Sequence, residues 1–248
     1  MSAPRLAWIR PEDPLPPARS ALTAPASLRG LVAAGEDLSV ARLCEAYGQG
    51  MFPWFTEDQP VLWWSPDPRM VLRTDAFRLH DSLRKTVRKF RRAADCEIRF
   101  DSAFGQVIRA CAHQPREGQA GTWIVDEMVQ AYDALHQAGH AHSVETWIDG
   151  ELVGGLYLVS LGRAVFGESM FTRRADASKI ALAALVAFAR AHGMPWIDCQ
   201  QNTRHLASLG AREMPREEFL QWVARECARD APLWRFDSIY WNSLLSSE

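Results

Sequence analysis

The stretch that decides the fold runs from His142 to Met170 and reads HSVETWIDGELVGGLYLVSLGRAVFGESM. Its periodicity is that of β-strands, and turn-forming residues interrupt it at Asp149-Gly150 and around Gly162. This combination is typical of antiparallel strands joined by tight turns. We therefore expect an antiparallel meander with strands over 143–148, 152–159 and 165–170.

The segments around this meander add helices and short strands. An Ala/Leu-rich helix is predicted over 177–192 with Gly193 ending it, and Trp196–Gln200 is predicted as a short buried strand. Asp101 and Asp126 are predicted to cap two further helices. The other predicted elements are helices over 38–47, 79–93, 102–112, 126–138, 204–209 and 216–228, and a strand over 96–100. Together they predict an α+β fold with a mainly antiparallel sheet.

A length of 248 residues accommodates a small and a larger domain, each with a buried core. Residues 1–27 contain six prolines and are predicted to form an extended lead-in. A small N-terminal α/β domain is predicted over 28–75, and a larger domain over 76–248. We find no signal-peptide pattern and no apolar run near the ~20 residues that a membrane span needs, so we expect a cytoplasmic protein that does not enter membranes.

Several familiar catalytic patterns are incomplete in this chain. Gly167-Glu-Ser169 begins the Gly-x-Ser-x-Gly pattern of serine hydrolases, but the fifth position is Phe171. His136 and His140 have the spacing of a zinc-binding pair, but Gly139 ends the predicted helix between them. The five cysteines are scattered and are expected to be reduced thiols. We therefore expect neither a metal nor a cofactor.

Two carboxylates lie in apolar sequence, where a lone charge is costly unless it is paired or used. Glu168 lies between Val165-Phe-Gly167 and Ser169-Met-Phe171, and Asp198 follows Trp196-Ile197. Gln200 is two residues beyond Asp198, which would place it on the same face of the predicted strand. The residues alone leave two interpretations open, a reactive site or buried salt bridges to Arg163, Arg204 or Arg212.

A basic ridge stands out against an otherwise acidic chain. Its six positive charges fall within nine residues, so that a net charge of −2 leaves −8 for the rest of the chain; they are Arg84, Lys85, Arg88, Lys89, Arg91 and Arg92. Acidic residues are nearly absent from this segment. We therefore favour contact with a polyanion over a solvated helix face.

Tryptophans in turn-rich sequence are a further candidate for ligand binding. There are ten in the chain, and Trp54, Trp63, Trp64 and Trp123 fall outside the predicted regular elements. Aromatic side chains in loops often line ligand sites. For Trp63 and Trp64 we favour core packing of the small N-terminal domain.

Short strings in a fixed order span about residues 28 to 219. They are Tyr47–Phe55 (YGQGMFPWF), Leu62–Leu72 (LWWSPDPRMVL), Gly121–Ile124 (GTWI), Gly139–Glu145 (GHAHSVE), Gly154–Tyr157 (GGLY), Gly167–Phe171 (GESMF), Ala177–Lys179 (ASK), Ile197–Gln200 (IDCQ) and His205–Ala211 (HLASLGA). Together they resemble the leucyl/phenylalanyl-tRNA:protein transferases. A single string would be weak, but so many collinear strings leave little room for chance.

This resemblance implies both a fold and a reaction. The implied fold is a small N-terminal domain followed by a domain related to the GCN5-type acetyltransferases. The implied reaction moves an amino acid, chiefly Leu or Phe with Met as a third candidate, from aminoacyl-tRNA to a protein that begins with Arg or Lys. That protein is thereby marked for degradation. We expect the enzyme to act as a monomer.

The resemblance also implies roles for individual residues. Asp198 and Gln200 match positions assigned to catalysis, and Glu168 matches the acidic residue near the acceptor. Matches to the positions that contact the terminal adenosine are Trp54, Trp123 and Tyr132, and matches to the amino-acid pocket are Met170, Leu185 and Ile197. The chain departs from the family pattern at Leu158, where Gly is expected, and at Val165, where an aromatic residue is expected.

The chemistry agrees with these roles, because an aminoacyl ester is already activated and requires no covalent intermediate. Whether Asp198 acts as a base or as a fixed charge stays open at this point. Two other functions use some of the same residues: an acyl-CoA-dependent N-acetyltransferase and a non-catalytic reader of basic N-termini. The former calls for a Gln/Arg-x-x-Gly-x-Gly/Ala turn, which we do not find over 163–180, and the latter would not need the basic ridge.

Overall fold

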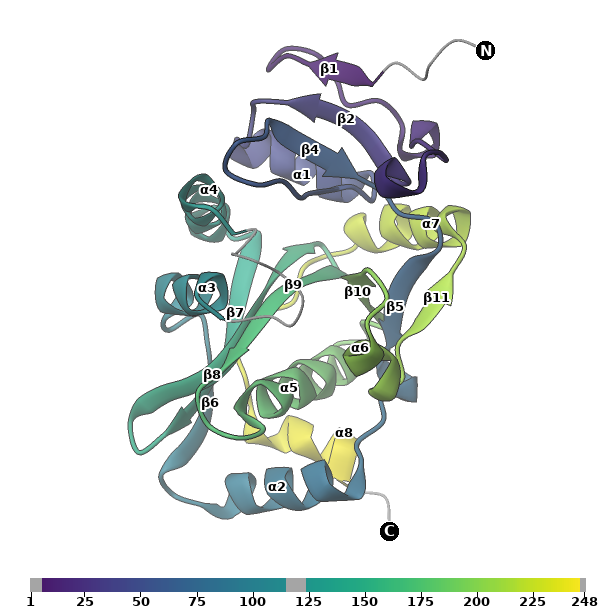
Figure 1. The fold of residues 1–248 in the computed structure, drawn as a ribbon. Coiled ribbons are helices and arrows are strands. Elements are labelled where there is room, and N and C mark those ends of the chain that lie inside the picture. Colours follow the sequence, from purple (N-terminus) through teal and green to yellow (C-terminus); the bar gives the residue numbers. More distant parts are fainter. Residues whose placement is uncertain (1–5, 115–123, 246–248) are drawn as a thin grey trace.

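The computed structural model describes residues 6–114 and 124–245, which form two sheets with helices around them (Figure 1). The smaller sheet has the strand order β1-β2-β4-β3, and the larger one has the order β11-β5-β10-β9-β8-β7-β6. In Figure 1 the smaller sheet lies above the larger one, with helix α7 (Arg216–Cys227) between them. The α+β class and the mainly antiparallel sheet predicted from sequence are confirmed.

The smaller sheet is built from strands β1 (Ala7–Ile9), β2 (Leu31–Gly35), β3 (Phe52–Pro53) and β4 (Val61–Trp64). Strand β4 is antiparallel to β2 and β3, and β1 is parallel to β2. Helix α1 (Val40–Gly48) packs beside β3, and the Ser39 side chain caps it by accepting a hydrogen bond from Arg42 N. Trp63 and Trp64 are buried, as core packing requires.

The larger sheet contains the meander as predicted. Strands β7 (Ala141–Ile148), β8 (Glu151–Leu161) and β9 (Ala164–Thr172) are antiparallel, and β6 (Cys96–Phe100) pairs with β7. Strand β10 (Trp196–Gln200) is parallel to β9 and antiparallel to β5 (Arg69–Arg73), which also pairs with β11 (Arg212–Met214). The β9–β10 pair is therefore where the sheet departs from antiparallel order.

Helices cover both faces of the larger sheet. Helices α3 (Phe104–Ala112) and α4 (Asp126–Gln137) share a buried apolar cluster with the smaller sheet, α1 and α7. The opposite cluster centres on α5 (Ala177–Ala191) with α2 (Asp81–Arg92) and α8 (Asn242–Leu245). The other short elements are α6 (Arg204–Ser208) and 3-10 helices at Ala18–Ser20, Ala26–Leu28, Thr74–Ala76 and Ser238–Trp241.

Both predicted aspartate caps are wrong. Asp101 has φ +58°, and its carboxylate accepts from Ser143 N at 2.8 Å instead of capping α3. The carboxylate that accepts from Ala103 N, at the start of α3, belongs to the buried Glu145 on β7. Asp126 is the first residue of α4 rather than its cap, which is Val125. At the start of α3, Glu145 from a neighbouring strand therefore accepts the kind of backbone hydrogen bond that we expected Asp101 to accept.

The two sheets do not coincide with the domain boundaries predicted from sequence. Strand β5 lies within the stretch 28–75, yet it pairs in the larger sheet. The predicted lead-in, residues 1–27, contains β1 and joins the smaller sheet. Strands β1, β2, β5 and β11 were not predicted. The domain division itself stays a prediction.

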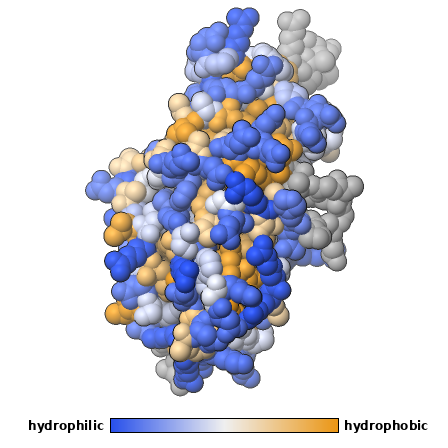
Figure 2. Space-filling view, turned by 90° about the vertical axis from the view of Figure 1, so that its left-hand side faces the viewer, coloured by the Kyte–Doolittle hydropathy of each residue, from blue (hydrophilic) through white to orange (hydrophobic). Residues whose placement is uncertain are grey.

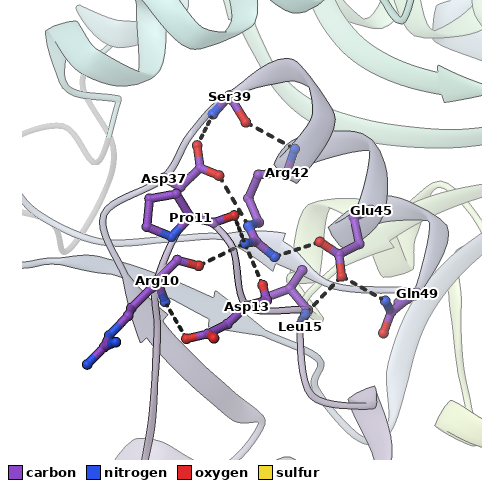
Figure 3. Close-up of polar contacts among 9 residues, drawn as sticks. All are labelled: Arg10, Pro11, Asp13, Leu15, Asp37, Ser39, Arg42, Glu45 and Gln49. Atoms are coloured by element: carbon purple, nitrogen blue, oxygen red, sulfur yellow. Dashed lines mark hydrogen bonds and ion pairs between the residues drawn. The ribbon is translucent and has the colours of Figure 1, made fainter.

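The buried side chain of Arg42 on α1 holds the lead-in (Figure 3). Its Nη2 donates to the backbone oxygens of Arg10, Pro11 and Asp13 at 3.1, 3.0 and 2.7 Å. Its Nη1 lies 2.6 Å from Glu45 Oε2, and Glu45 Oε1 in turn accepts from Leu15 N at 2.8 Å. Prolines provide no N–H groups for sheet pairing, so these side-chain bonds replace a strand ladder along the segment.

We expect Arg42→Ala to lower the free energy of unfolding by about 2–3 kcal/mol, because three backbone carbonyls and Glu45 lose a buried partner. Urea unfolding followed by circular dichroism measures the change. Arg19→Ala is the matched control, since Arg19 is exposed and its loss is expected to stay within about 0.5 kcal/mol. Equal values for the two variants would contradict the role of Arg42.

Candidate active site

A cavity of about 690 Å³ lies where strands β9 and β10 meet helices α5 and α6 and strand β3 of the smaller sheet. Its size is within the range of small-molecule sites. Apolar side chains supply much of its wall, among them Leu156, Met170, Leu182, Leu185 and Ile197. Phe52, Pro53 and Trp54 line the side formed by the smaller sheet. Residues of both sheets therefore line the cavity.

The pairing of β9 with β10 is short, and the polar residues of the cavity follow it. It consists of Ile197 with Val165 and Asp198 with Phe166, although the strands continue to Gln200 and Thr172. On the other side of β10 the register against β5 shifts between Asp198 and Gln200. Gln200 has φ +61°, a left-handed conformation that is uncommon for a residue with a side chain. Simple strand alternation therefore ends at this residue.

Glu168 on β9 is the centre of a hydrogen-bond network at the cavity wall. Its Oε1 accepts from Tyr47 Oη at 2.7 Å and from Gln200 Nε2 at 2.9 Å. Its Oε2 lies 3.4 Å from Tyr132 Oη, which also makes a short hydrogen bond with the hydroxyl of Tyr47. Burial raises the pKa of Glu168 to about 7, while the bonds from Tyr47 and Gln200 partly oppose that rise. The carboxyl group therefore titrates near neutral pH.

Asp198 has different surroundings. Its Oδ1 accepts from Arg69 Nε at 2.8 Å, and its Oδ2 lies 2.6 Å from Arg69 Nη2. Both side chains have an exposed fraction of 0%, so this two-pronged pair is sealed from solvent. Oδ1 also accepts from Gln200 N at 2.8 Å. The salt bridge that the sequence left open is thus present for Asp198, but its partner is Arg69.

Arg69 is the residue that sequence reasoning missed. The arginines considered there were Arg163, Arg204 and Arg212, and Arg163 instead donates to the backbone oxygens of His192 and Asp230. A signal was available, because Arg69 precedes the apolar run Met70-Val-Leu72 and is itself fully buried. A lone charge in such a strand requires an opposite charge nearby. We applied this reasoning to Asp198 but not to Arg69.

The residues expected to contact substrate are brought together in part. Trp54, Met170, Leu185 and Ile197 line the cavity with Glu168, Asp198 and Gln200. Tyr132 is fully buried, and its hydroxyl reaches the cavity through Glu168. Trp123 lies outside the described residues. Leu158 and Val165, the two departures from the family pattern, are fully buried and pack in the same cluster as Leu185 and Ile197.

Cys199 lies between the two polar residues of β10 and also lines the cavity. Burial raises the pKa of its thiol, and the negative charge of Asp198 raises it further. A thiolate is the nucleophilic form of cysteine, so this side chain is poorly suited to nucleophilic catalysis.

The basic ridge lies on α2, at the end of the molecule opposite the smaller sheet (Figure 1). Lys85, Lys89, Arg91 and Arg92 are exposed, whereas Arg84 and Arg88 are half-buried. Arg84 donates to the backbone oxygens of Leu79 and Leu244 at 3.3 and 3.2 Å, so it also fastens the C-terminal helix α8. Of the six ridge residues, four therefore have side chains exposed to solvent.

The surface seen in Figure 2 mixes hydrophilic and apolar residues, with apolar ones gathered between the upper and lower parts of the molecule. Across residues 6–114 and 124–245, no helix is both long and apolar enough to cross a membrane.

Comparison with known proteins gives the family. The family model described as leucyl/phenylalanyl-tRNA protein transferase matches residues 71–224, and the model of its N-terminal domain matches residues 36–67. The chain belongs to the leucyl/phenylalanyl-tRNA–protein transferase family. It is therefore an aminoacyl-tRNA-dependent aminoacyltransferase, and the resemblance inferred from the short strings is confirmed.

Relatives of the same name match nearly the whole chain. The transferase of Polaromonas sp. is 58% identical over 241 residues, covering 97% of this chain and 94% of its own length. That of Albidiferax ferrireducens is 56% identical over 245 residues, covering 99% and 96%. Among solved structures, the L-PGS of Bacillus licheniformis is 12% identical with a TM-score of 0.40, covering 79% of this chain and 72% of its own. A GCN5-related N-acetyltransferase from Kribbella flavida is 11% identical with a TM-score of 0.35, covering 69% and 59%.

The raised pKa of Glu168 predicts a pH dependence of stability. The folded state holds the proton up to about pH 7, whereas the unfolded chain releases it near the ordinary glutamate pKa of 4.5. The carboxyl group therefore contributes stability that is fully present below about pH 4.5 and is lost as pH rises through about 7. Relative to Glu168→Gln, the wild type is expected to lose at most about 3 kcal/mol across this window.

Urea unfolding of both proteins at half-unit steps from pH 4.5 to 7.5 measures this difference. The variant keeps the size and polarity of the side chain but cannot ionise. A constant difference between the two free energies of unfolding would show that Glu168 does not titrate in this range.

Proposed function

We propose that this chain transfers Leu, Phe or Met from aminoacyl-tRNA to the N-terminal amine of proteins that begin with Arg or Lys. The observation that carries the proposal is the apolar cavity with Glu168 and Gln200 at its wall. Such a site can take up the uncharged side chain of the donor amino acid. The ester that joins this amino acid to tRNA then faces an amine held at the Glu168 carboxyl group. The modified protein is thereby marked for degradation, and the enzyme acts in the cytoplasm as a monomer.

The lining of the cavity supports the choice of donor. Met170, Leu185 and Ile197 offer an apolar surface on which a Leu, Phe or Met side chain loses contact with water, whereas a charged side chain would lose its hydration without a partner. Trp54 on the side of the smaller sheet offers a ring for stacking with the terminal adenosine. Tyr132 supports that side through its hydroxyl contacts, and we keep Trp123 as a further adenosine contact by family resemblance.

We propose that Glu168 and Gln200 receive the acceptor amine. An N-terminal amine has a pKa of about 7.7–8.0, and the pKa of Glu168 is about 7, so transfer of a proton between them is nearly balanced. Gln200 donates through Nε2 to Glu168, which leaves its carbonyl oxygen as the atom that can accept from the amine. A cationic first side chain on the acceptor favours the ionised form of Glu168.

The reaction then requires little covalent help from the protein. The neutral amine nitrogen attacks the ester carbonyl carbon, the new amide bond forms, and the bond to the ribose oxygen breaks. The ionised Glu168 accepts the proton that the amine loses. That proton finally passes to the ribose oxygen, which leaves as a hydroxyl group. Asp198 has both oxygens bound to Arg69 and no exposed surface, so we propose that it serves as a fixed charge instead of a base.

One incubation tests the transfer itself. Charged Leu-tRNA is mixed with a peptide that begins with Arg and, separately, with the same peptide acetylated at its N-terminus. Mass spectrometry is expected to find one added Leu at the N-terminus of the free peptide alone. Equal labelling of both peptides would contradict N-terminal transfer, and acetyl-CoA turnover by a tRNA-free sample would favour an N-acetyltransferase.

The exposed part of the basic ridge is expected to bind tRNA phosphates. Reversal of Lys85, Lys89 and Arg92 to Glu should weaken tRNA binding by about 10–100-fold and lower the slope of log K against log salt by about one per lost contact. Filter binding at several salt concentrations measures both. Reversal of Arg10, Arg19 and Arg235, which are exposed elsewhere, is the control with the same change of charge. An equal loss in both triple variants would remove the ridge from tRNA binding.

A further inference from the structure

Arg69 is joined to more of the site than the salt bridge alone. Its guanidinium carbon lies 4.8 Å from the ring centre of Phe52 and 4.5 Å from that of Phe219. Its Nη1 donates to Gly50 O at 3.3 Å. The fork towards Asp198 is thus held between the smaller sheet on one side and α7 on the other, and it has little freedom to turn.

The space around this fork is closely filled. Gly50 has φ +73°, and a Cβ atom placed there would lie 2.4 Å from Leu220 Cδ2 and 3.1 Å from a ring carbon of Phe219. The positive φ favours glycine here, and any larger residue would also displace the Leu220 side chain of α7. The same contact brings the Gly50 oxygen and the Phe219 ring to the guanidinium.

Asp198 passes this constraint to Gln200. The oxygen that accepts from Arg69 Nε also accepts from Gln200 N, so one carboxylate atom joins the buried cation to the backbone of the next polar residue. Gln200 has left-handed φ next to a register shift, a conformation that persists only where its surroundings hold it. From this position the Gln200 amide reaches Glu168 at 2.9 Å.

We propose that Arg69 is a positioning residue, which through Asp198 holds the backbone of Gln200 in its left-handed conformation and so aims the Gln200 amide at Glu168 and the acceptor amine. This inference rests on the proposed function. Arg69 itself touches neither substrate. It makes the geometry of the catalytic wall depend on how the smaller sheet and α7 seat against β5 and β10.

The position of the charge explains why arginine is present rather than lysine. Lysine could neutralise Asp198, but a single ammonium cannot bond both carboxylate oxygens as a fork and also keep the contacts of a planar guanidinium with the Phe52 and Phe219 rings. With Arg69→Lys the Asp198 carboxylate gains freedom to rotate, and its bond to Gln200 N weakens. The loss therefore falls on the orientation of Gln200 while the charge is kept.

The test is a set of double variants with Gln200→Ala. Arg69→Lys alone is expected to lower kcat for transfer of Leu to an Arg-peptide by about 10–100-fold, with KM for Leu-tRNA changed less than about threefold. In the Gln200→Ala background the same exchange is expected to cost less than about threefold, because the group that Arg69 positions is already gone. Arg73→Lys, on the exposed end of β5, is the matched control and should leave kcat unchanged in both backgrounds.

If the kcat loss of the double variant equals the product of the fold losses of Arg69→Lys and Gln200→Ala, the proposal is overturned. Arg69 would then act on something other than Gln200. If Arg69→Lys does not fold, as judged by circular dichroism, the uncharged pair Arg69→Met with Asp198→Asn replaces it. The expectation is again a kcat loss that disappears in the Gln200→Ala background. A further loss in that background would show that Asp198 acts directly, as a base, and would also overturn the proposal.

These outcomes are distinct from failure of the proposed function. If the wild type does not label an Arg- or Lys-peptide from Leu-tRNA, the function is wrong whatever Arg69 does. If the wild type labels the peptide and the losses multiply, the function stands and the role given to Arg69 is wrong.

Discussion

The pair of Arg69 and Asp198 is the interaction on which the arrangement of the site depends. A buried ion pair adds little net stability when compared with apolar side chains of similar size, because both charges lose their hydration. Loss of one partner is nevertheless costly, at about 3–5 kcal/mol, since the other charge stays buried. Such a pair specifies which surfaces meet. Here it requires β5, β10, the smaller sheet and α7 to come together at one point, and the cavity wall begins there.

The carboxyl groups of Glu168 on β9 and Asp198 on β10 lie on paired strands but have different surroundings. Asp198 faces a cation and is bonded on both oxygens, whereas Glu168 faces hydroxyls and an amide, all of which are neutral. Asp198 is paired with the Arg69 cation, whereas burial raises the pKa of Glu168 to about 7. The two acidic side chains both lie in apolar strands, so the different roles proposed for them rest on the groups that each one contacts.

Local pattern predicted the elements of the fold well where one strand follows another. The meander from β7 to β9 and the helix α5 come from alternation and helical spacing with glycine at the ends, and these signals lie within the elements themselves. The pairing of β5 with β10 joins residues more than a hundred positions apart, so no window of sequence contains it. For the same reason Asp198 was recognised as a costly charge while Arg69 was missed. The left-handed Gln200 also has no local signal, because glutamine rarely adopts that conformation. Similarly, the cap expected of Asp101 failed because Glu145 on a neighbouring strand reaches the helix start.

Helix α1 has two tasks at its two ends. Arg42 and Glu45 hold the segment from Arg10 to Leu15, and Tyr47, near the last residue of the same nine-residue helix, bonds to Glu168. The spacing between the lead-in and α1 is therefore part of the geometry of the site. Residues added before Arg10 would leave that spacing intact. One residue inserted between Asp13 and Leu15 would separate the carbonyl that Arg42 binds from the amide that Glu45 binds, and the strain would reach Tyr47. An insertion at Asp13–Leu15 is therefore expected to disturb the site more than an extension before Arg10.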